Sequence, residues 1–161
     1  MNFDKYTIRA QEAVQTAVQS AQLGRQQSVE PLHLLKGIME KGKDMLNFIF
    51  QKLGANAHGV EMALQNELQH LPKVDRGQPY FSNETTQVFN QAESISQQWG
   101  DEFVSIEPLL MAIMKGNNTA GRIIKDAGCT EDGMRKAIEE LRQGQQVQTQ
   151  SGEENYQSLG K

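Results

Sequence analysis

The chain has 161 residues, of which 37% are hydrophobic and 22% charged, and its formal net charge at pH 7 is -4. This length predicts one globular domain with a real core, and the acidic balance without a Lys and Arg cluster argues against nucleic acid as a partner. No stretch approaches the roughly 18 consecutive apolar residues of a membrane span, and no apolar signal segment opens the sequence. With a single cysteine that excludes an internal disulfide, these features predict a cytoplasmic location and no membrane partner.

The first half of the sequence predicts four helices. Thr7 precedes apolar residues that recur at i+3 and i+4, which indicates an amphipathic helix with a hydroxyl cap at its start. A second helix opens at Pro31, where the missing N–H costs nothing. A third, from about Asp44 to Leu53, stops at Gly54, and Asn56 can cap a fourth.

The pattern then repeats after a break. Residues 72–79 contain two prolines and a glycine, which cannot continue a helix and indicate a linker. Beyond it, Ser82 can cap a first helix, Pro108 opens a second, a third runs from about Thr119 to Ala127, and Thr130 can cap a fourth.

This duplication is visible in the residues themselves. Ser-Val-Glu-Pro-Leu at 28–32 returns as Ser-Ile-Glu-Pro-Leu at 105–109, and further matches before and after it keep the same order. No stretch shows the sustained alternation of a strand. We therefore expect an all-α fold of about eight helices, arranged as two pseudo-twofold four-helix repeats packed into one domain over residues 1–143. Repeat one covers about 3–71 and repeat two about 80–143.

From about residue 144 the composition changes. The segment 144–161 is rich in Gln, Gly and Ser, and its apolar residues are only Val147, Tyr156 and Leu159. Such a segment buries too little surface to offset its ordering entropy. It predicts a flexible linker that leads toward a further domain not contained in these residues.

The two Glu-Pro-Leu helices, the duplication and the ending Glu-Glu-Asn-Tyr-Gln-Ser-Leu-Gly-Lys at 153–161 together resemble the Clp N-terminal domain family, most closely its ClpB branch. The resemblance implies a domain that captures unfolded or aggregated polypeptide for an ATP-driven hexameric ring, whose ATP and magnesium are bound in the ATPase module beyond residue 161. As an alternative it implies a docking site for an adaptor protein, as in the ClpA and ClpC branches. The isolated domain is expected to be a monomer.

The resemblance also implies three client-binding side chains, Thr7, Asp101 and Glu107, at the polar edge of an apolar groove between the repeats. The residues themselves allow simpler roles. Thr7 suits a helix N-cap, Asp101 is a loop carboxylate after Gly100, and Glu107 lies near a helix start, where the macrodipole favours a negative charge. Both kinds of role are compatible with each residue.

The sequence predicts no catalytic, cofactor or metal site in this chain. The phosphate-binding pattern G-x-x-x-x-G-K-[ST] does not occur. His33, His58 and His70 share no i, i+4 pair of the zinc-binding kind, and Cys129 has no basic partner nearby in the sequence. We interpret His33 as a packing residue of the second helix.

Overall fold

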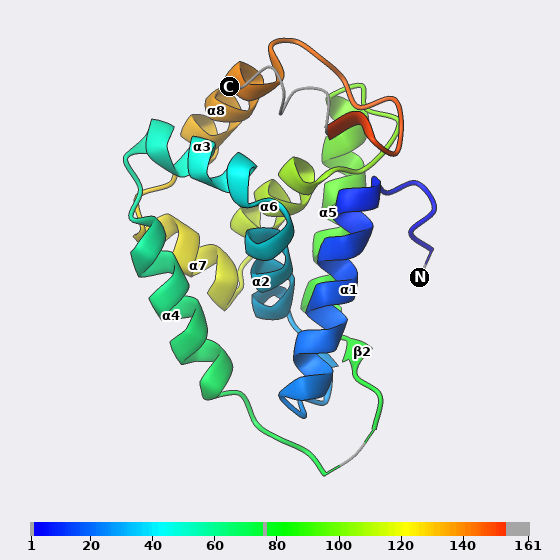
Figure 1. Ribbon diagram of the computed structural model, residues 1–161, viewed down its shortest axis with the longest axis vertical. Helices are drawn as coiled ribbons and strands as arrows, with labels where there is room; N and C mark the ends of the chain where they lie inside the picture. The colour runs from blue at the N-terminus through cyan, green and yellow to red at the C-terminus, as the bar shows by residue number, and fades with distance from the viewer. Residues whose placement is uncertain (1, 76, 154–161) are drawn as a thin grey trace.

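The computed structural model describes residues 2–75 and 77–153 (Figure 1). In chain order its elements are α1 (Ile8–Leu23), β1 (Ser28–Val29), α2 (Pro31–Lys41), α3 (Lys43–Leu53), α4 (Ala57–Gln69), β2 (Tyr80–Phe81), α5 (Asn83–Gln98), α6 (Ile106–Lys115), α7 (Thr119–Asp126) and α8 (Glu131–Arg142). The predicted all-α class is confirmed, with eight helices in the described part of the chain. None of these helices has both the length and the hydropathy needed to cross a membrane.

The helix starts follow the polar residues singled out in the sequence. Thr7 Oγ1 accepts a hydrogen bond from Ala10 N–H at 3.1 Å, and Ser82 Oγ accepts one from Thr85 N–H at the same distance. These bonds satisfy donors that have no partner within the first turn of α1 and α5. One boundary differs from the prediction: α6 begins at Ile106, two residues before Pro108, because a proline is tolerated anywhere in a first turn that needs no N–H.

The expectation of no strand pairing is wrong in a small way. β1 and β2 form a short parallel ladder, and Tyr6 forms an isolated parallel bridge with Val104. Matching bonds support the two pairings: Thr7 N–H donates to Val104 O at 2.9 Å, and Ser82 N–H donates to Val29 O at 3.2 Å. The segment that leads into the first helix of each repeat therefore lies beside the segment that leads into the second helix of the other repeat, which interlocks the halves.

The helices pack in the same pairs in both halves. α1 lies against α2 and α5 against α6, while α3 packs on α8 and α4 on α7 across the two repeats. α2 and α6 are the central helices and contact each other (Figure 1). The close approach of α1 and α2 requires a glycine, because a Cβ at Gly37 would lie 2.1 Å from the carbonyl oxygen of Ala13. The largest fully buried side chains are Tyr6, Leu34, Leu35, Ile38, Ile49, Phe89, Ile106, Leu109, Leu110, Ile113 and Met114.

Residues 144–153 do not extend away from the domain, so the expected flexible segment does not begin at residue 144. After α8 this segment crosses back toward the starts of α1 and α6 (Figure 1). Glu102 N–H donates to Val147 O at 2.9 Å, Ile8 N–H donates to Gln150 O at 2.8 Å, and Val147 is fully buried. Composition could not indicate this packing, because the hydrogen-bond partners of the segment are mostly backbone groups of other segments. The rest of the predicted linker, 154–161, lies outside the described residues.

Candidate functional site

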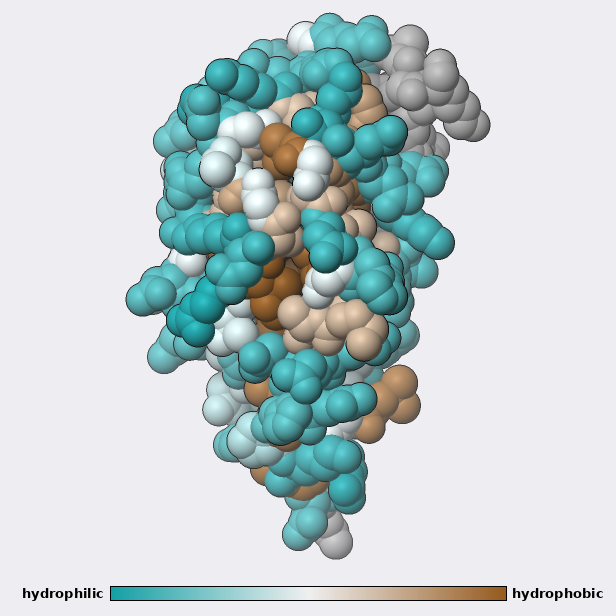
Figure 2. Space-filling model, turned by 90° about the vertical axis from the view of Figure 1, so that its left-hand side faces the viewer, coloured by the Kyte–Doolittle hydropathy of each residue, from teal (hydrophilic) through white to brown (hydrophobic). Residues whose placement is uncertain are grey.

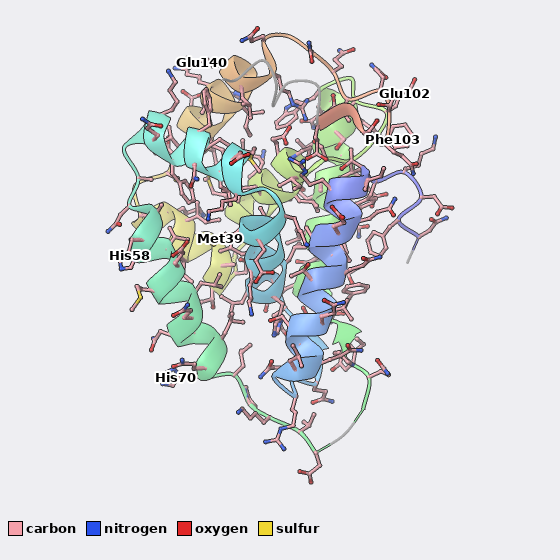
Figure 3. The ribbon with its side chains drawn as sticks, viewed as in Figure 1. Met39, His58, His70, Glu102, Phe103 and Glu140 are labelled. Carbon is pink, nitrogen blue, oxygen red and sulfur yellow. The ribbon has the colours of Figure 1, made fainter. Side chains whose placement is uncertain are left out.

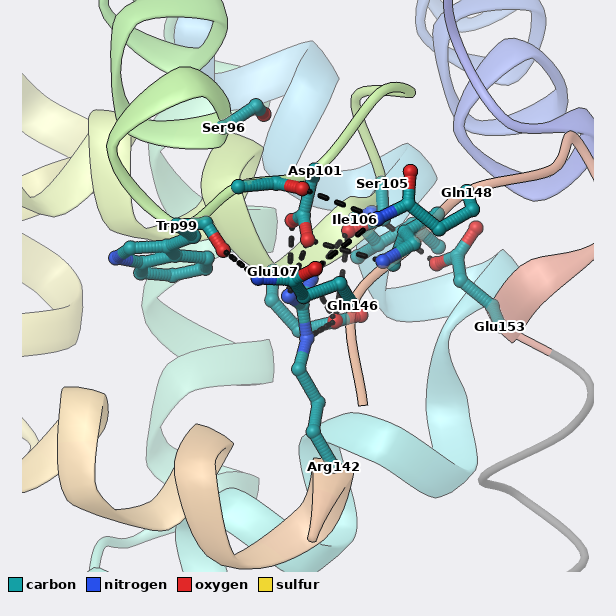
Figure 4. Close-up of polar contacts among 12 residues, drawn as sticks. Ser96, Trp99, Asp101, Ser105, Ile106, Glu107, Arg142, Gln146, Gln148 and Glu153 are labelled. Carbon is teal, nitrogen blue, oxygen red and sulfur yellow. Dashed lines mark hydrogen bonds and ion pairs between the residues drawn. The ribbon is translucent and has the colours of Figure 1, made fainter. Parts of the chain in front are cut away.

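Two of the three predicted site residues meet at one buried arginine (Figure 4). Asp101 follows α5, Glu107 lies in the first turn of α6, and Arg142 ends α8. Arg142 Nη1 donates to Asp101 Oδ2 at 2.8 Å, and Arg142 Nε donates to Glu107 Oε1 at 2.9 Å. All three side chains are buried. The structure therefore places both acidic residues in an ion triad inside the domain.

The triad also ties the segment after α8 to the domain. Asp101 Oδ1 accepts the N–H of Val147 at 2.9 Å, and Ser105 Oγ accepts a bond from Arg142 Nη2 at 2.9 Å. Buried charges are tolerated only when they are paired and their remaining hydrogen-bonding positions are filled. The hydrogen-bonding positions of Asp101 and Arg142 are filled in this way. The triad therefore links the end of α5, the start of α6 and the end of α8.

Thr7 lies beside this triad and holds another carboxyl group. Its hydroxyl donates to Oε1 of Glu153, and the N–H of Ile106 donates to the other carboxyl oxygen at 3.1 Å. The Glu153 side chain thus bridges the starts of α1 and α6. Burial, followed by the charge of Glu107, raises the pKa of Glu153 to about 8, against the hydrogen bonds from Thr7 and Ile106 and the charge of Arg9.

Sequence reasoning missed Arg142 and Glu153. Arg142 gives little signal, because it ends a helix whose exposed face already carries other charges. Glu153 follows a polar run of the kind that sequence analysis assigns to flexible segments. In this structure Thr7, Asp101 and Glu107 are all buried beneath or beside 144–153. Their client-binding role therefore remains a prediction.

The first repeat has a polar cluster at the corresponding place, built from other residues. His33 Nδ1 accepts the N–H of Glu30 at 2.9 Å, so its Nε2 carries the proton and faces Gln26 Oε1 at 3.2 Å. Burial lowers the pKa of His33 to about 4, which keeps the ring neutral near pH 7. His33 is buried as expected of a packing residue, and it also caps the start of α2.

An apolar groove of about 600 Å³ lies between α2, α3 and α4. Leu46, Phe50 and Leu64 are buried in its floor, and the partly buried Met39 and Leu68 line it. Figure 3 shows Met39 on the side of α2 that faces α4, and His58 and His70 at the two ends of α4. The rim of the groove carries side chains of both charge signs, namely Lys36, Glu40, Lys43 and Glu61. This groove lies within the first repeat, whereas the sequence analysis expected it between the repeats.

A smaller hollow of about 330 Å³ does lie between the repeats, where α4 meets α7. Ala63, Ile123 and Ala127 contribute its apolar part, and polar side chains such as Glu67 and Arg122 complete it. Figure 2 views this side of the molecule and shows apolar atoms along the middle of the face with hydrophilic residues around them. Helix α4 is therefore flanked by apolar surface on both sides.

The remaining candidates for chemistry are the lone cysteine and clusters of metal-binding side chains. Cys129 is buried, and burial raises the pKa of its thiol to about 11, so the reactive thiolate is disfavoured at neutral pH. In residues 2–75 and 77–153, no group of three or more His, Cys, Asp and Glu side chains is placed to hold a metal ion.

The fold places the chain among duplicated all-helical domains, in which two four-helix repeats interlock into one unit. The model of one such family, the Clp repeat N-terminal domain, matches residues 5–127. The chain belongs to this family.

Individual relatives agree with this assignment. The chain is 48% identical to the chaperone protein ClpB of Bacteroides thetaiotaomicron and 42% identical to that of Porphyromonas gingivalis, in both cases over all of this chain and 19% of the relative. It therefore spans about a fifth of the length of these proteins. Among solved structures, the Hsp104 N-terminal domain from Candida albicans matches with a TM-score of 0.83 at 21% identity, over 93% of this chain and 99% of that one. This last likeness concerns the fold.

Proposed function

We propose that this chain is the client-binding N-terminal domain of a ClpB-type protein-disaggregating chaperone of the cytoplasm, and that it binds unfolded or aggregated polypeptide in the groove between α2, α3 and α4. The observation that carries the proposal is the groove itself, an open apolar surface with a rim of mixed charge. Membership of the Clp repeat family, and likeness to ClpB chaperones over the whole chain, support it.

The chemistry of the groove suits clients of varied sequence. Apolar client side chains that leave water against Phe50 and Leu64 contribute about 25 cal/mol for each Å² they bury. A rim with both charge signs favours neither acidic nor basic flanking residues. Because the groove is shallow and a client loses freedom on binding, we expect a dissociation constant in roughly the micromolar range or weaker. Several copies on a hexameric parent would add avidity.

Two substitutions at the wall of the groove test the proposal. In the double variant Met39→Gln and Leu68→Gln, two apolar contacts with the client are lost while the buried floor stays intact. We expect binding of a fluorescent, reduced and carboxymethylated unfolded protein to weaken roughly tenfold, as measured by fluorescence anisotropy. Met62→Gln is the matched control, because Met62 lies on α4, is 54% exposed and does not line the groove.

The same assay separates this function from adaptor docking, the alternative implied by the resemblance. An adaptor platform binds one folded protein in a fixed ratio and is indifferent to unfolded chains. Equal affinity of wild type and double variant for the unfolded probe would exclude the groove as the client site. Absence of any binding to the unfolded probe would exclude client binding by this chain.

A further inference from the structure

Two hydrogen-bond donors converge on one carboxyl group where α1 and α6 begin. Ile106 is the first residue of α6, and its N–H has no partner within the helix because the first four N–H groups of any α-helix lack one. Glu153 supplies that partner and accepts the hydroxyl of Thr7 with its other oxygen. Glu153 is 3% exposed, although no apolar side chain surrounds it in the sequence. The Glu153 carboxyl group thus occupies a site formed by the starts of α1 and α6.

The segment that carries Glu153 is attached by backbone bonds and by the exposed side chains of Gln146, Gln148 and Gln150, which donate to backbone carbonyl groups of the domain. Val147 and Gln150 accept bonds from Glu102 and Ile8, and Val147 also donates to Asp101. Val147 is the only large apolar side chain among residues 144–153, and 148–150 are exposed. Few buried apolar contacts and many surface backbone bonds are typical of segments that open locally below the global unfolding free energy.

We propose that residues 145–153 are a displaceable internal ligand of the seat formed by Thr7 and the first turn of α6, and that a polypeptide client with a carboxyl side chain binds the same seat once they leave. The second half of this inference rests on the proposed function, whereas the first half does not. The segment contacts Thr7 through Glu153 and Asp101 through Val147, so the exposure of these two predicted site residues depends on its release.

The charges around Glu153 give the contact a direction of pH dependence. Glu107 on α6 faces it with a like charge, Arg9 on α1 opposes that effect, and Arg142 on α8 is committed to Glu107 and Asp101. A carboxyl whose pKa rises from 4.5 to about 8 on docking is held most strongly as the neutral acid. Docking is therefore fully favoured below pH 4.5 and weakens by up to about tenfold per pH unit as the pH rises toward 8.

Amide protection in the full chain tests the first half without any client. Val147→Asp is expected to lower the protection factors of the Ile8 and Glu102 amides at least tenfold, measured by NMR hydrogen exchange, and Val147→Ser is a milder second variant. The Ser82 amide, which donates to Val29 O and makes no bond with residues 145–153, is the internal control and keeps its protection. Glu153→Gln keeps an acceptor for Ile106 but cannot ionise, so it removes the pH dependence of protection. If Ile8 and Glu102 exchange only together with the deepest core amides, the segment is a fixed part of the fold and the proposal is overturned.

The second half is tested in a chain that already carries Met39→Gln and Leu68→Gln. These changes weaken binding in the groove, so the binding that is measured reports on the seat. The probe is a labelled peptide with the sequence of residues 145–153, added in trans to the Val147→Asp chain. Because release raises the competent fraction, we expect it to bind roughly tenfold more tightly than to the chain with Val147 intact. The further change Thr7→Val removes this gain. Equal binding with and without Val147→Asp would overturn competition for the seat, whatever the outcome at the groove.

Discussion

The two repeats have different buried polar residues at matching positions after their first helix. In repeat one the residue with a positive φ after the first helix is Arg25, and in repeat two it is Gly100 at the matching position. The next residue is Gln26 in one repeat and Asp101 in the other, and both are buried. Gln26 faces His33 of its own repeat, whereas Asp101 pairs with Arg142 at the far end of the second repeat.

This difference in buried polar residues explains why the segment after α8 packs on the polar cluster of repeat two and not on that of repeat one. In repeat one, His33 caps the start of α2 and its neutral ring contacts the neutral side chain of Gln26. Leu110 stands at the matching place in repeat two and can cap nothing. Arg142 from α8 and the carboxyl group of Glu153 complete the cluster of repeat two instead. The two copies of a duplicated fold can therefore contain different buried polar residues, provided that each buried polar group has a hydrogen-bond partner.

The largest expected effect follows from removing the charge that distinguishes repeat two. Arg142→Leu places a leucine where repeat one has Leu68, and it leaves Asp101 and Glu107 buried without their cation. We expect the free energy of unfolding to fall by about 3–5 kcal/mol, measured by urea denaturation. Arg135→Leu on the same helix is the control and should cost less than about 1 kcal/mol, because Arg135 is exposed. A loss below 1 kcal/mol for Arg142→Leu would contradict the triad's role.

A second prediction concerns the protonation of His33 in repeat one. Because the pKa of His33 is lowered from 6.5 to about 4, the unfolded chain binds the additional proton between these values. The contribution of His33 to stability is complete above pH 6.5 and is lost as the pH falls toward 4, by up to roughly 3 kcal/mol. His33→Leu, which imitates Leu110, should remove this part of the acid dependence in urea titrations from pH 7 to 4. His58→Gln, which removes an exposed histidine, is the control. Identical pH profiles for wild type and His33→Leu would argue against a buried neutral ring.

The smallest expected effect compares the two helix caps. Ser82→Ala removes the bond from Thr85 N–H and the bond that the Ser82 hydroxyl donates to Thr85 Oγ1, and it should cost about 1 kcal/mol of unfolding free energy. Thr7→Ala removes the matching bond to Ala10 and also the donor to Glu153, so it should cost about 1 kcal/mol more. Both values can be measured by thermal and urea unfolding at pH 5, where Glu153 is docked. Equal costs for the two variants would show that the contact between Thr7 and Glu153 contributes no more to stability than the local bond between Ser82 and Thr85.

Much of the fold could be predicted because its signals are local. Hydroxyl and amide caps at Thr7, Asn56, Ser82 and Thr130 all begin helices, and the apolar spacing gives the buried face of each. The ladder between β1 and β2 could not be predicted, because two-residue strands leave no alternation in the sequence. The same holds for residues 144–153, whose binding depends on backbone groups supplied by distant segments.

The candidate site depends more on tertiary structure. A resemblance implied Thr7, Asp101 and Glu107 as client-binding residues, and this role stays a prediction because all three are buried. The sequence did not identify the groove of the first repeat, since Met39, Phe50 and Leu68 have the spacing of ordinary core residues. Whether such residues close a core or line an opening depends on how far α4 lies from α2 and α3.

The sequence by itself determined the helical class, the duplication and the helix starts, because hydrogen bonding within a turn and side-chain periodicity act over a few residues. The tertiary structure alone decided which charges meet, since Arg142 lies 35 residues from Glu107 and 41 from Asp101 along the chain. It also decided that Glu153 is seated beside Thr7, across 146 residues of sequence. Contacts of this kind depend on the packing of whole helices, which no local pattern encodes.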